Sequence, residues 1–347
     1  MLRTHFLGID LHKKNLVWSL LDEHGTELQC ETVRSHPEHI STALLQLSVR
    51  TEYITAVIEP TCGWRWVSKL LEEHGCAVKY AHPLKVRMIA DSTEKTDRRD
   101  AFTLANLLRT GYLPEAYRAP DDIYELRTLV RERTSIVRAR ADAYNRLHGI
   151  ATTQGIHAIP KHNPRSQSGM TYIQNSDNVV LKEILTLTEV LTERIAVYDQ
   201  LLKEASDKHS DIKRLMSMPG IGIITATTVV AEVGDFSRFA TAKQLAKYAG
   251  LVPKQRSSGE RIRHGGITRA GSSILRSTMV EAAMRIHAKG APELYGFVAR
   301  LNKTTGKKPS RVALARKLLT LMWHLVMKDT TYDSTLVRCG MSVQTTL

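Results

Sequence analysis

The sequence predicts a fold of class α/β plus α, in which a mixed sheet with helices precedes long helices and a mainly helical basic domain. The first 118 residues alternate apolar runs and helical periods in the order β-β-α-β-α-β-α, which is typical of a sheet covered by helices on its faces. From Asp121 onward, apolar residues recur at spacings of three and four within long charged segments, as in helices. We therefore expect three domains, over residues 1–118, 119–205 and 206–347.

In the first domain, elements are expected where apolar runs end at turn residues. Gly25 supplies a turn between the first two strands, and Gly75 and Gly111 stop two helices. The expected strands are residues 5–21, 27–34, 53–60 and 76–83, and the expected helices are residues 36–50, 62–75 and 97–111.

The second domain is expected to be a pair of long helices. Residues 124–151 form a charged helical segment, residues 155–178 are rich in Pro, Gly, Ser and Asn and are expected to be a loop, and residues 179–202 form a second helix. A seam in the second helix predicts an antiparallel helix pair or an intermolecular coiled coil. Because arginines interrupt the apolar stripe of the first helix, a plain two-helix excursion is the alternative. The seam consists of Ile184, Leu187, Leu191, Ile195, Tyr198 and Leu202.

The net positive charge lies entirely in the third domain. Residues 1–205 hold 26 Lys and Arg and 26 Asp and Glu, whereas residues 206–347 hold 23 and 9, so the excess there equals the whole net charge of +14. A basic domain of this kind indicates a polyanionic partner, most often nucleic acid. The alternatives are a solvated surface or a patch for anionic membranes, but no basic amphipathic helix with an aromatic face supports a membrane.

Composition argues against several other classes of protein. A hydrophobic content of 42% is not that of a disordered chain, and no stretch is apolar for long enough to cross a bilayer or to form a signal-peptide core. The four cysteines lack metal-ligand spacing, which predicts reduced thiols and a cytoplasmic location. They are Cys30, Cys62, Cys76 and Cys339.

Four carboxylates of the first domain are placed where its elements can bring them together. Asp10 lies inside the apolar run "LGIDLH", where an unpaired carboxylate is costly to bury, and Glu59 ends the strand "AVIEP". Asp97 and Asp100 share one face at a helix start. Converged carboxylates repel one another and require a cation. Oxygen ligands suit Mg²⁺ or Mn²⁺, which stabilise the attacking and leaving oxygens of phosphoryl transfer.

Each acid also has a structural alternative. Asp97 could be a helix N-cap, Asp100 a first-turn acid that faces the helix dipole, and Glu59 the end of a strand. Asp10 is the hardest of the four to explain in this way. The order of the acids on strand, strand and helix favours a shared site.

Two further motifs lie in the basic domain. In "MPGIGIITA", Gly220 and Gly222 separate two helical stretches like a helix-hairpin-helix, in which backbone N–H groups approach a phosphate. An ordinary helix–helix turn is the alternative.

In "PKQRSSGERIRHGGITRAG", Ser257 and Ser258 precede Gly259 in an expected loop that is crowded by cationic residues. Such residues bind phosphates, and a serine there could attack a phosphodiester. From spacing alone, a phosphate-binding loop with flexible serines is favoured. The cationic residues are Lys254, Arg256, Arg261, Arg263 and Arg269.

Over nearly its full length the chain resembles the DEDD insertion-sequence transposases of the one-hundred-and-ten group, also called bridge-RNA-guided recombinases. "GIDLHKK", "VIEPT" and "KTDRRDA" match the three acidic motifs of their RuvC-like (ribonuclease-H-like) domain. "PGIG", "LAKYAGLVP" and "SSGERIRHGGITRAGSSILR" match their C-terminal transposase domain. The departures are Pro60, where a small residue is common, and the serine doublet.

The resemblance assigns the catalytic, metal-binding tetrad to Asp10, Glu59, Asp97 and Asp100. It assigns the nucleophile to Ser258, five residues after Pro253. It implies a DNA transposase that forms a covalent phosphoserine, uses Mg²⁺, and is guided by a structured noncoding RNA. It also implies a bacterial, nucleoid-associated homo-oligomer, a dimer or tetramer in which the acids of one protomer meet Ser258 of another. The alternatives are a metal-dependent junction-resolving endonuclease and a nonenzymatic nucleic-acid-binding protein.

Overall fold

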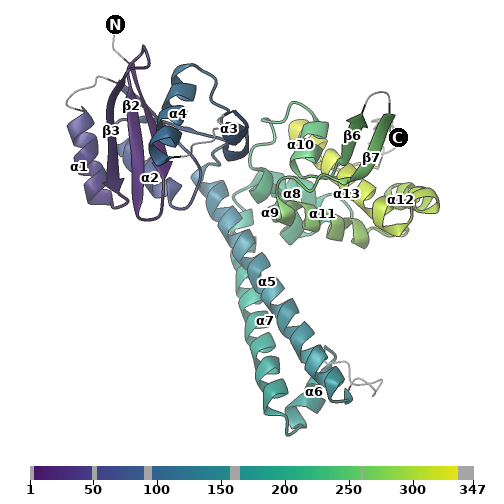
Figure 1. The fold of residues 1–347 in the computed structure, drawn as a ribbon. Coiled ribbons are helices and arrows are strands. Elements are labelled where there is room, and N and C mark those ends of the chain that lie inside the picture. The colour runs from purple at the N-terminus through teal and green to yellow at the C-terminus, as the bar shows by residue number, and fades with distance from the viewer. Residues whose placement is uncertain (1–3, 49–52, 90–95, 157–164, 259–260, 335–347) are drawn as a thin grey trace. The chain divides into compact units, whose positions relative to one another are not determined.

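The computed structural model describes residues 4–48, 53–89, 96–156, 165–258 and 261–334, with the side chains of 48, 255–258 and 261–264 left out (Figure 1). The chain divides into two compact units, Met1–Arg118 and Ala119–Leu347. Within the described residues, no helix combines the length and the apolar character needed to cross a membrane.

The first unit is built on a five-stranded mixed sheet in the order β3-β2-β1-β4-β5. β1 pairs antiparallel with β2 and parallel with β4, β2 pairs antiparallel with β3, and β4 pairs parallel with β5. The predicted mixed sheet is therefore confirmed. The strands are β1 (Thr4–Leu11), β2 (Asn15–Leu21), β3 (Glu27–Arg34), β4 (Tyr53–Ile58) and β5 (Ala77–Tyr80).

The expectation of one strand over residues 5–21 was wrong, because that segment is the hairpin of β1 and β2. The register pairs Leu11 with Leu16, and the N–H of His12 donates to the carbonyl of Asn15 at 2.9 Å. Three polar residues, His12–Lys14, form the turn. Both strands are almost entirely buried, so the apolar pattern continues across the turn and hides it.

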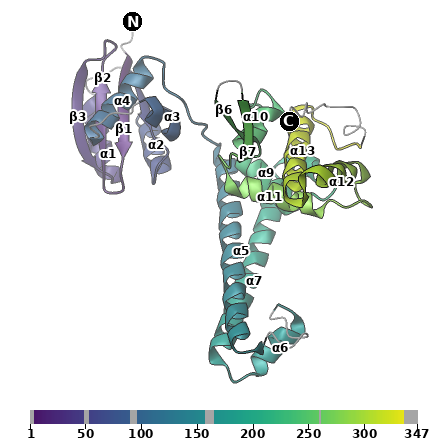
Figure 2. The ribbon, with the colours of Figure 1, turned by 45° about the vertical axis from the view of Figure 1, so that its right-hand side comes forward.

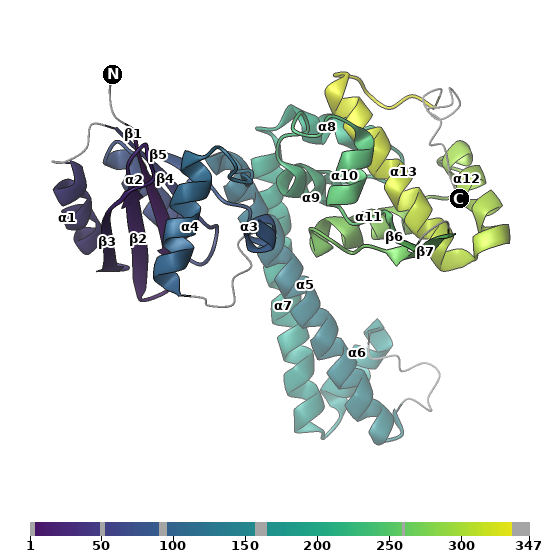
Figure 3. The same ribbon diagram turned by 45° about the horizontal axis from the view of Figure 1, so that its top comes forward.

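Helices cover both faces of this sheet (Figures 1 and 3). α1 and α2 pack against the face to which Leu7, Ile9 and Leu11 of β1 belong. α3 and α4 share the other core, with Val57 and Ala81. Helix α3 was not expected from the sequence. The helices are α1 (Pro37–Ser48), α2 (Trp64–Glu73), α3 (Pro83–Ile89) and α4 (Asp97–Arg109).

In the second unit, α5 (Asp121–Thr153) and α7 (Val179–Ser206) run side by side, with α6 (Gln167–Asn175) near their far end (Figure 2). The expectation of a loop over residues 155–178 was wrong at α6. Ser166 caps this helix by accepting from the N–H of Gly169, and Ile173 packs into the small core of the helix pair. A cap and one buried apolar residue are enough for such a short helix, and its polar composition conceals it.

The remaining helices of this unit pack in one core with the start of α5 and the end of α7. An ion pair joins α5 to α9 within it. The side chain of Glu232 is 1% exposed and accepts two hydrogen bonds from Arg131, at 2.8 and 3.1 Å. These helices are α8 (Ser210–Met216), α9 (Ile223–Val233), α10 (Ala242–Tyr248), α11 (Ser273–Arg285), α12 (Pro292–Thr305) and α13 (Lys307–Met327).

The loop expected around the two serines is a hairpin in the structure, and a second polar segment is helical. The segment with the two serines forms an antiparallel hairpin of β6 (Pro253–Ser258) and β7 (Arg261–Ile267). The basic segment "NKTTGKKPSR" is helical except at Gly306, whose φ of 82° separates α12 from α13. Both segments are polar and lack an apolar period, so they resemble loops in sequence.

Candidate metal centre and nucleic-acid-binding elements

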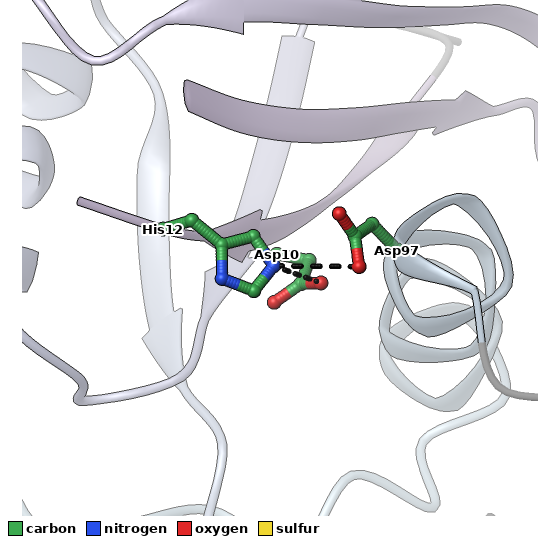
Figure 4. Close-up of side chains that lie close together, drawn as sticks. All are labelled: Asp10, His12 and Asp97. Carbon is green, nitrogen blue, oxygen red and sulfur yellow. Dashed lines mark hydrogen bonds and ion pairs between the residues drawn. The ribbon is translucent and has the colours of Figure 1, made fainter. Parts of the chain in front are cut away.

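Asp10, His12 and Asp97 converge at the end of β1 (Figure 4). His12 Nε2 lies 3.2 Å from Asp10 Oδ2 and 3.5 Å from Asp97 Oδ1. One possible ligand atom from each residue lies within 4.8 Å of the other two. The Asp10 side chain is 18% exposed, whereas those of His12 and Asp97 are more than half exposed. The cluster is thus open to solvent on one side, as an ion-binding site requires.

Gly8 allows α4 to approach β1 closely enough for this cluster to form. A Cβ atom at Gly8 would lie 2.0 Å from the carbonyl oxygen of Ala101 and 2.5 Å from the backbone nitrogen of Ala105. The period of two along a strand puts Gly8 and Asp10 on the same face of the sheet. The close backbone contact therefore brings the first turn of α4 to Asp10.

The start of α4 is fixed by a cap and an ion pair. Thr96 is the N-cap, and its side chain accepts from the N–H of Arg99 at 3.3 Å, so the alternative that Asp97 caps this helix was wrong. Asp97 and Asp100 both lie in the first turn. Arg98 donates to Glu27 of β3 at 2.6 Å, which ties the same turn to the sheet.

The pKa of Asp10 is shifted by its burial and by the other charged groups of the cluster. Burial raises the pKa of its carboxyl, the nearby His12 opposes the rise, and the charges of Asp97 and Asp100 add to it. A raised carboxyl pKa means that the ionised form of Asp10 is disfavoured in the folded state. The free energy of unfolding therefore falls as the pH rises from the ordinary carboxyl pKa through the raised pKa of Asp10. A bound cation would relieve this cost.

Glu59 comes next to Asp10 through the sheet register. β1 and β4 are parallel, and their last paired residues are Ile9 and Ile58. Asp10 and Glu59 follow these two residues at the same end of adjacent strands, and the Glu59 side chain is partly buried. Asp100 acts on Asp10 through its charge.

The side chains of the cluster fit a divalent cation. Asp10 at the end of β1 and Asp97 at the start of α4 offer carboxylates, and His12 in the turn after β1 offers an imidazole. Asp100 adds negative charge. Carboxylate oxygens suit Mg²⁺ and Mn²⁺, and imidazole suits borderline ions. His12 was missed as a site residue in the sequence. Its position two residues after Asp10 is the signal that would have found it.

In the second unit, the predicted nucleophile Ser258 is the last residue of β6 and pairs with Arg261 of β7. The side chains of Ser257, Ser258, Arg256, Arg261 and Arg263 lie outside the described residues. Gly259 is also outside them.

The base of the β6–β7 hairpin is pinned by close backbone contacts. A Cβ atom at Gly250 would lie 2.3 Å from the carbonyl oxygen of Ala270, and one at Gly271 would lie 1.9 Å from that of Tyr248. Arg276 donates to the carbonyls of Ala249 and Ala270. Lys254 and Arg269 are exposed beside this base.

Gly220 and Gly222 lie between α8 and α9. Gly220 has a φ of 75°, a left-handed conformation that favours glycine, and Gly222 is the N-cap of α9. No side chain caps that helix N-terminus. The backbone N–H groups at the start of α9 are suited to an anion.

Comparison with known proteins agrees with these motifs. A family model named DEDD_Tnp_IS110 and described as a transposase matches residues 7–154. A second model, the transposase IS116/IS110/IS902 family, matches residues 212–298. The transposase for insertion sequence element IS1111A of Coxiella burnetii is 27% identical, covering 96% of this chain and 91% of the relative. The transposase for IS1328 of Yersinia enterocolitica is 25% identical, covering 94% and 98%. The pilin gene-inverting protein of Moraxella lacunata is 25% identical, covering 94% and 97%.

These matches define the class as that of insertion-sequence transposases and related recombinases. Within that class, the chain belongs to the IS110 family of transposases, which confirms the resemblance drawn from its motifs. Membership implies, broadly, enzymatic DNA strand transfer. Transposases of the DEDD type normally use a divalent metal ion.

Proposed function

We propose that this protein excises and inserts its own mobile element by phosphoryl transfer on DNA, through a covalent phosphoserine and a metal-dependent DEDD site. The observation that carries the proposal is the convergence of Asp10 and Asp97, coupled by charge to Asp100, at the end of β1. The family and the position of Ser258 at the end of β6, in the β6–β7 hairpin with its cationic residues, support the rest.

In this proposal the four acids hold a divalent cation, Mg²⁺ or Mn²⁺. When bound, the cation stabilises charge that develops on the phosphate oxygens. Asp10 and Glu59 present carboxylates from the ends of adjacent parallel strands, and Asp97 and Asp100 present theirs from the first turn of α4. Because the acids come from rigid elements, they would hold the cation, and with it a phosphate bound to the cation, in a fixed place.

Ser258 is the proposed nucleophile. Its Oγ forms a bond to phosphorus while the bond from phosphorus to the 3′ oxygen of the DNA breaks. The hydroxyl proton leaves Oγ, and the 3′ oxygen gains a proton to become a free hydroxyl. A 3′-hydroxyl can later attack the phosphoserine and release the serine, so rejoining needs no ATP.

The basic hairpin and the glycine turn are the proposed DNA-binding elements. Lys254 and Arg269 are exposed at the hairpin base, and Arg256, Arg261 and Arg263 belong to its strands. Gly220 and Gly222 would let the N-terminus of α9 approach a DNA phosphate. These contacts read the DNA backbone. We therefore assign the choice of target to a structured noncoding RNA that pairs with donor and target DNA, as the family resemblance implies.

A metal-dependent junction endonuclease is the second candidate, because the acidic cluster alone would be enough for hydrolysis by water. Both candidates require Asp10. We expect Asp10→Asn to lower DNA cleavage at least about a hundredfold, as expected when a group that stabilises transition-state charge is lost. The same substitution should raise the melting temperature of the metal-free protein at neutral pH, because it removes a carboxylate whose pKa is raised by burial.

The stability gain should vanish as the pH falls below the ordinary carboxyl pKa, since Asp10 is then neutral in both the folded and the unfolded state. Melting curves from neutral to acid pH and cleavage of supercoiled plasmid are the two measurements. Asp22→Asn, at a surface turn of the same unit, is the matched control for cleavage. Normal cleavage by the Asp10→Asn variant would contradict the proposed site.

We further propose an oligomer in which the acids of one protomer act with Ser258 of another. Helix α7 supports it with exposed apolar residues at spacings of seven, three, seven and four, which are those of a coiled-coil seam. One of them, Leu187, belongs to the seam predicted from the sequence, whereas Ile184, Ile195 and Leu202 of that seam are buried within the unit. The residues with these spacings are Val180, Leu187, Val190, Val197 and Leu201, and Val179 is exposed beside them.

Complementation tests this shared site. Ser258→Ala and Asp10→Asn chains are each inactive, but an equal mixture should recover cleavage, up to about a quarter of the wild-type level for randomly paired symmetric dimers. Only mixed dimers hold one intact serine and one intact set of acids in the same composite site. A chain carrying both substitutions, mixed with either single variant, is the negative control. Complete inactivity of demonstrably co-assembled single variants would show that each site lies within one protomer.

A further inference from the structure

The geometry points to His12 as a nitrogen ligand of the divalent cation, so that the centre has a mixed nitrogen and oxygen donor set. This inference rests on the proposed function, because it assumes that Asp10 and Asp97 hold a metal. It adds a ligand that lies outside the four predicted acids, on the turn between β1 and β2.

The distances within the cluster are close to those of neighbouring ligands on one ion. His12 Nε2 is 3.2 Å from an oxygen of Asp10 and 3.5 Å from an oxygen of Asp97. Adjacent ligands of an octahedral ion with bonds of about 2.1 Å lie roughly 3 Å apart. The imidazole nitrogen is therefore placed where a third ligand would be, on the solvent-facing side of Asp10.

A hydrogen bond from His12 cannot account for the closeness of both carboxylates to its Nε2 atom. Nε2 of a histidine carries at most one proton, and here it lies between two carboxylates. A proton on Nε2 can point at only one of them well. A cation between the three groups would contact both carboxylates and the nitrogen together.

Hydrogen bonds fix the backbone of His12, which favours a role as a metal ligand over that of a mobile surface residue. Its N–H donates to the carbonyl of Asn15 at 2.9 Å, and its own carbonyl accepts from the Ser35 hydroxyl at 2.9 Å. The N–H of Ser35 donates to the carbonyl of Lys14 at 2.9 Å. The turn is thus tied to the end of β3. Its imidazole is half exposed, so an ion can reach it from solvent.

A nitrogen ligand changes which ion the centre prefers. Carboxylate and water oxygens suit both Mg²⁺ and Mn²⁺, but Mn²⁺, as a first-row transition-metal ion, accepts an imidazole nitrogen more readily than Mg²⁺ does. We therefore expect His12→Gln, which retains a polar side chain without the imidazole, to weaken Mn²⁺ binding about tenfold. The affinity for Mg²⁺ should change much less.

Pulsed electron paramagnetic resonance of Mn²⁺ bound to the full-length protein tests the inference without relying on activity. A histidine ligand gives a ¹⁴N modulation in the electron spin echo. The wild-type protein should show this modulation, and protein labelled with ¹⁵N-histidine should show it replaced by a ¹⁵N signal. In His12→Gln the nitrogen modulation should be absent while Mn²⁺ remains bound.

Two variants locate the signal. His24→Gln removes an exposed histidine that also lies beside a carboxylate, Glu23, in the same unit, and should leave the modulation unchanged. Asp10→Asn should weaken Mn²⁺ binding and remove the modulation together. Circular dichroism checks that each variant is folded.

The outcomes separate this inference from the proposed function. Wild-type protein that binds Mn²⁺ in an Asp10-dependent way without nitrogen modulation would overturn the role of His12 and leave the acidic centre standing. A modulation that persists in His12→Gln would also overturn it. Wild-type protein that fails to bind Mn²⁺ would overturn both the inference and the proposed metal centre.

Discussion

Replacing Ser258 with alanine is expected to eliminate the covalent protein–DNA adduct and to lower strand cleavage at least about a thousandfold. Once a covalent nucleophile is lost, only the rate supplied by binding and by electrostatic stabilisation remains. The substitution removes one hydroxyl oxygen near the end of β6 and leaves every cationic residue of the hairpin in place. DNA binding should therefore stay within about twofold of wild type, because phosphate contacts dominate affinity.

The adduct is measured by trapping with denaturant after incubation with end-labelled DNA, followed by electrophoresis and protease digestion. Ser257→Ala is the matched control, since it removes the same atom one residue earlier. It should retain the adduct. If Ser257→Ala loses the adduct and Ser258→Ala keeps it, the nucleophile is Ser257. If Ser258→Ala cleaves normally and neither variant forms an adduct, hydrolysis by an endonuclease is the better account.

The first unit was largely predictable because its strands and helices have strong and distinct apolar periods. The four strand-containing segments and three of the helices lie where the sequence placed them. The β1–β2 turn was missed because both strands are buried, so no alternation marks the change of direction. The same error concealed His12. Its place in the turn at the end of β1, close to Asp10, is evident only when the hairpin is recognised.

The acidic site was predictable in its residue types but not in its geometry. Asp10 was conspicuous as a charge in an apolar run, and the spacing of Asp97 and Asp100 fits one helix face. Which helix face meets which strand depends on packing between segments nearly ninety residues apart in sequence. Gly8, which allows that packing, has no distinctive sequence context. The hairpin that contains Ser258 was not predicted, because two short polar strands carry little periodic signal.

Replacing Gly8 with alanine is expected to damage both the fold and the site, because α4 has no room to accept a side chain there. The new Cβ would meet the carbonyl oxygen of Ala101 at 2.0 Å and the nitrogen of Ala105 at 2.5 Å, and both are backbone atoms. The helix must then move away from β1. Overpacking of a core costs about 1–3 kcal/mol and occasionally more, and we expect the upper end of that range or beyond.

The displacement should carry Asp97 and Asp100 away from Asp10, so Mn²⁺ affinity and DNA cleavage should fall together with the free energy of unfolding. Denaturant unfolding, calorimetric Mn²⁺ titration and plasmid cleavage measure the three effects. Gly149→Ala is the matched control, because that glycine lies within α5 with no atom within 4 Å of the added Cβ. It should stabilise the chain by about 0.5–1 kcal/mol.

A second substitution shows whether the backbone is the cause of the damage. Ala105→Gly removes the one side-chain atom among the three atoms nearest to the new Cβ, at 3.0 Å, and leaves both backbone contacts. The Gly8→Ala, Ala105→Gly chain should therefore stay as impaired in Mn²⁺ binding as Gly8→Ala alone. Recovery of binding in the double variant would mean that α4 is positioned by side-chain packing. Normal binding in Gly8→Ala itself would mean that Asp97 and Asp100 do not depend on this contact to reach Asp10.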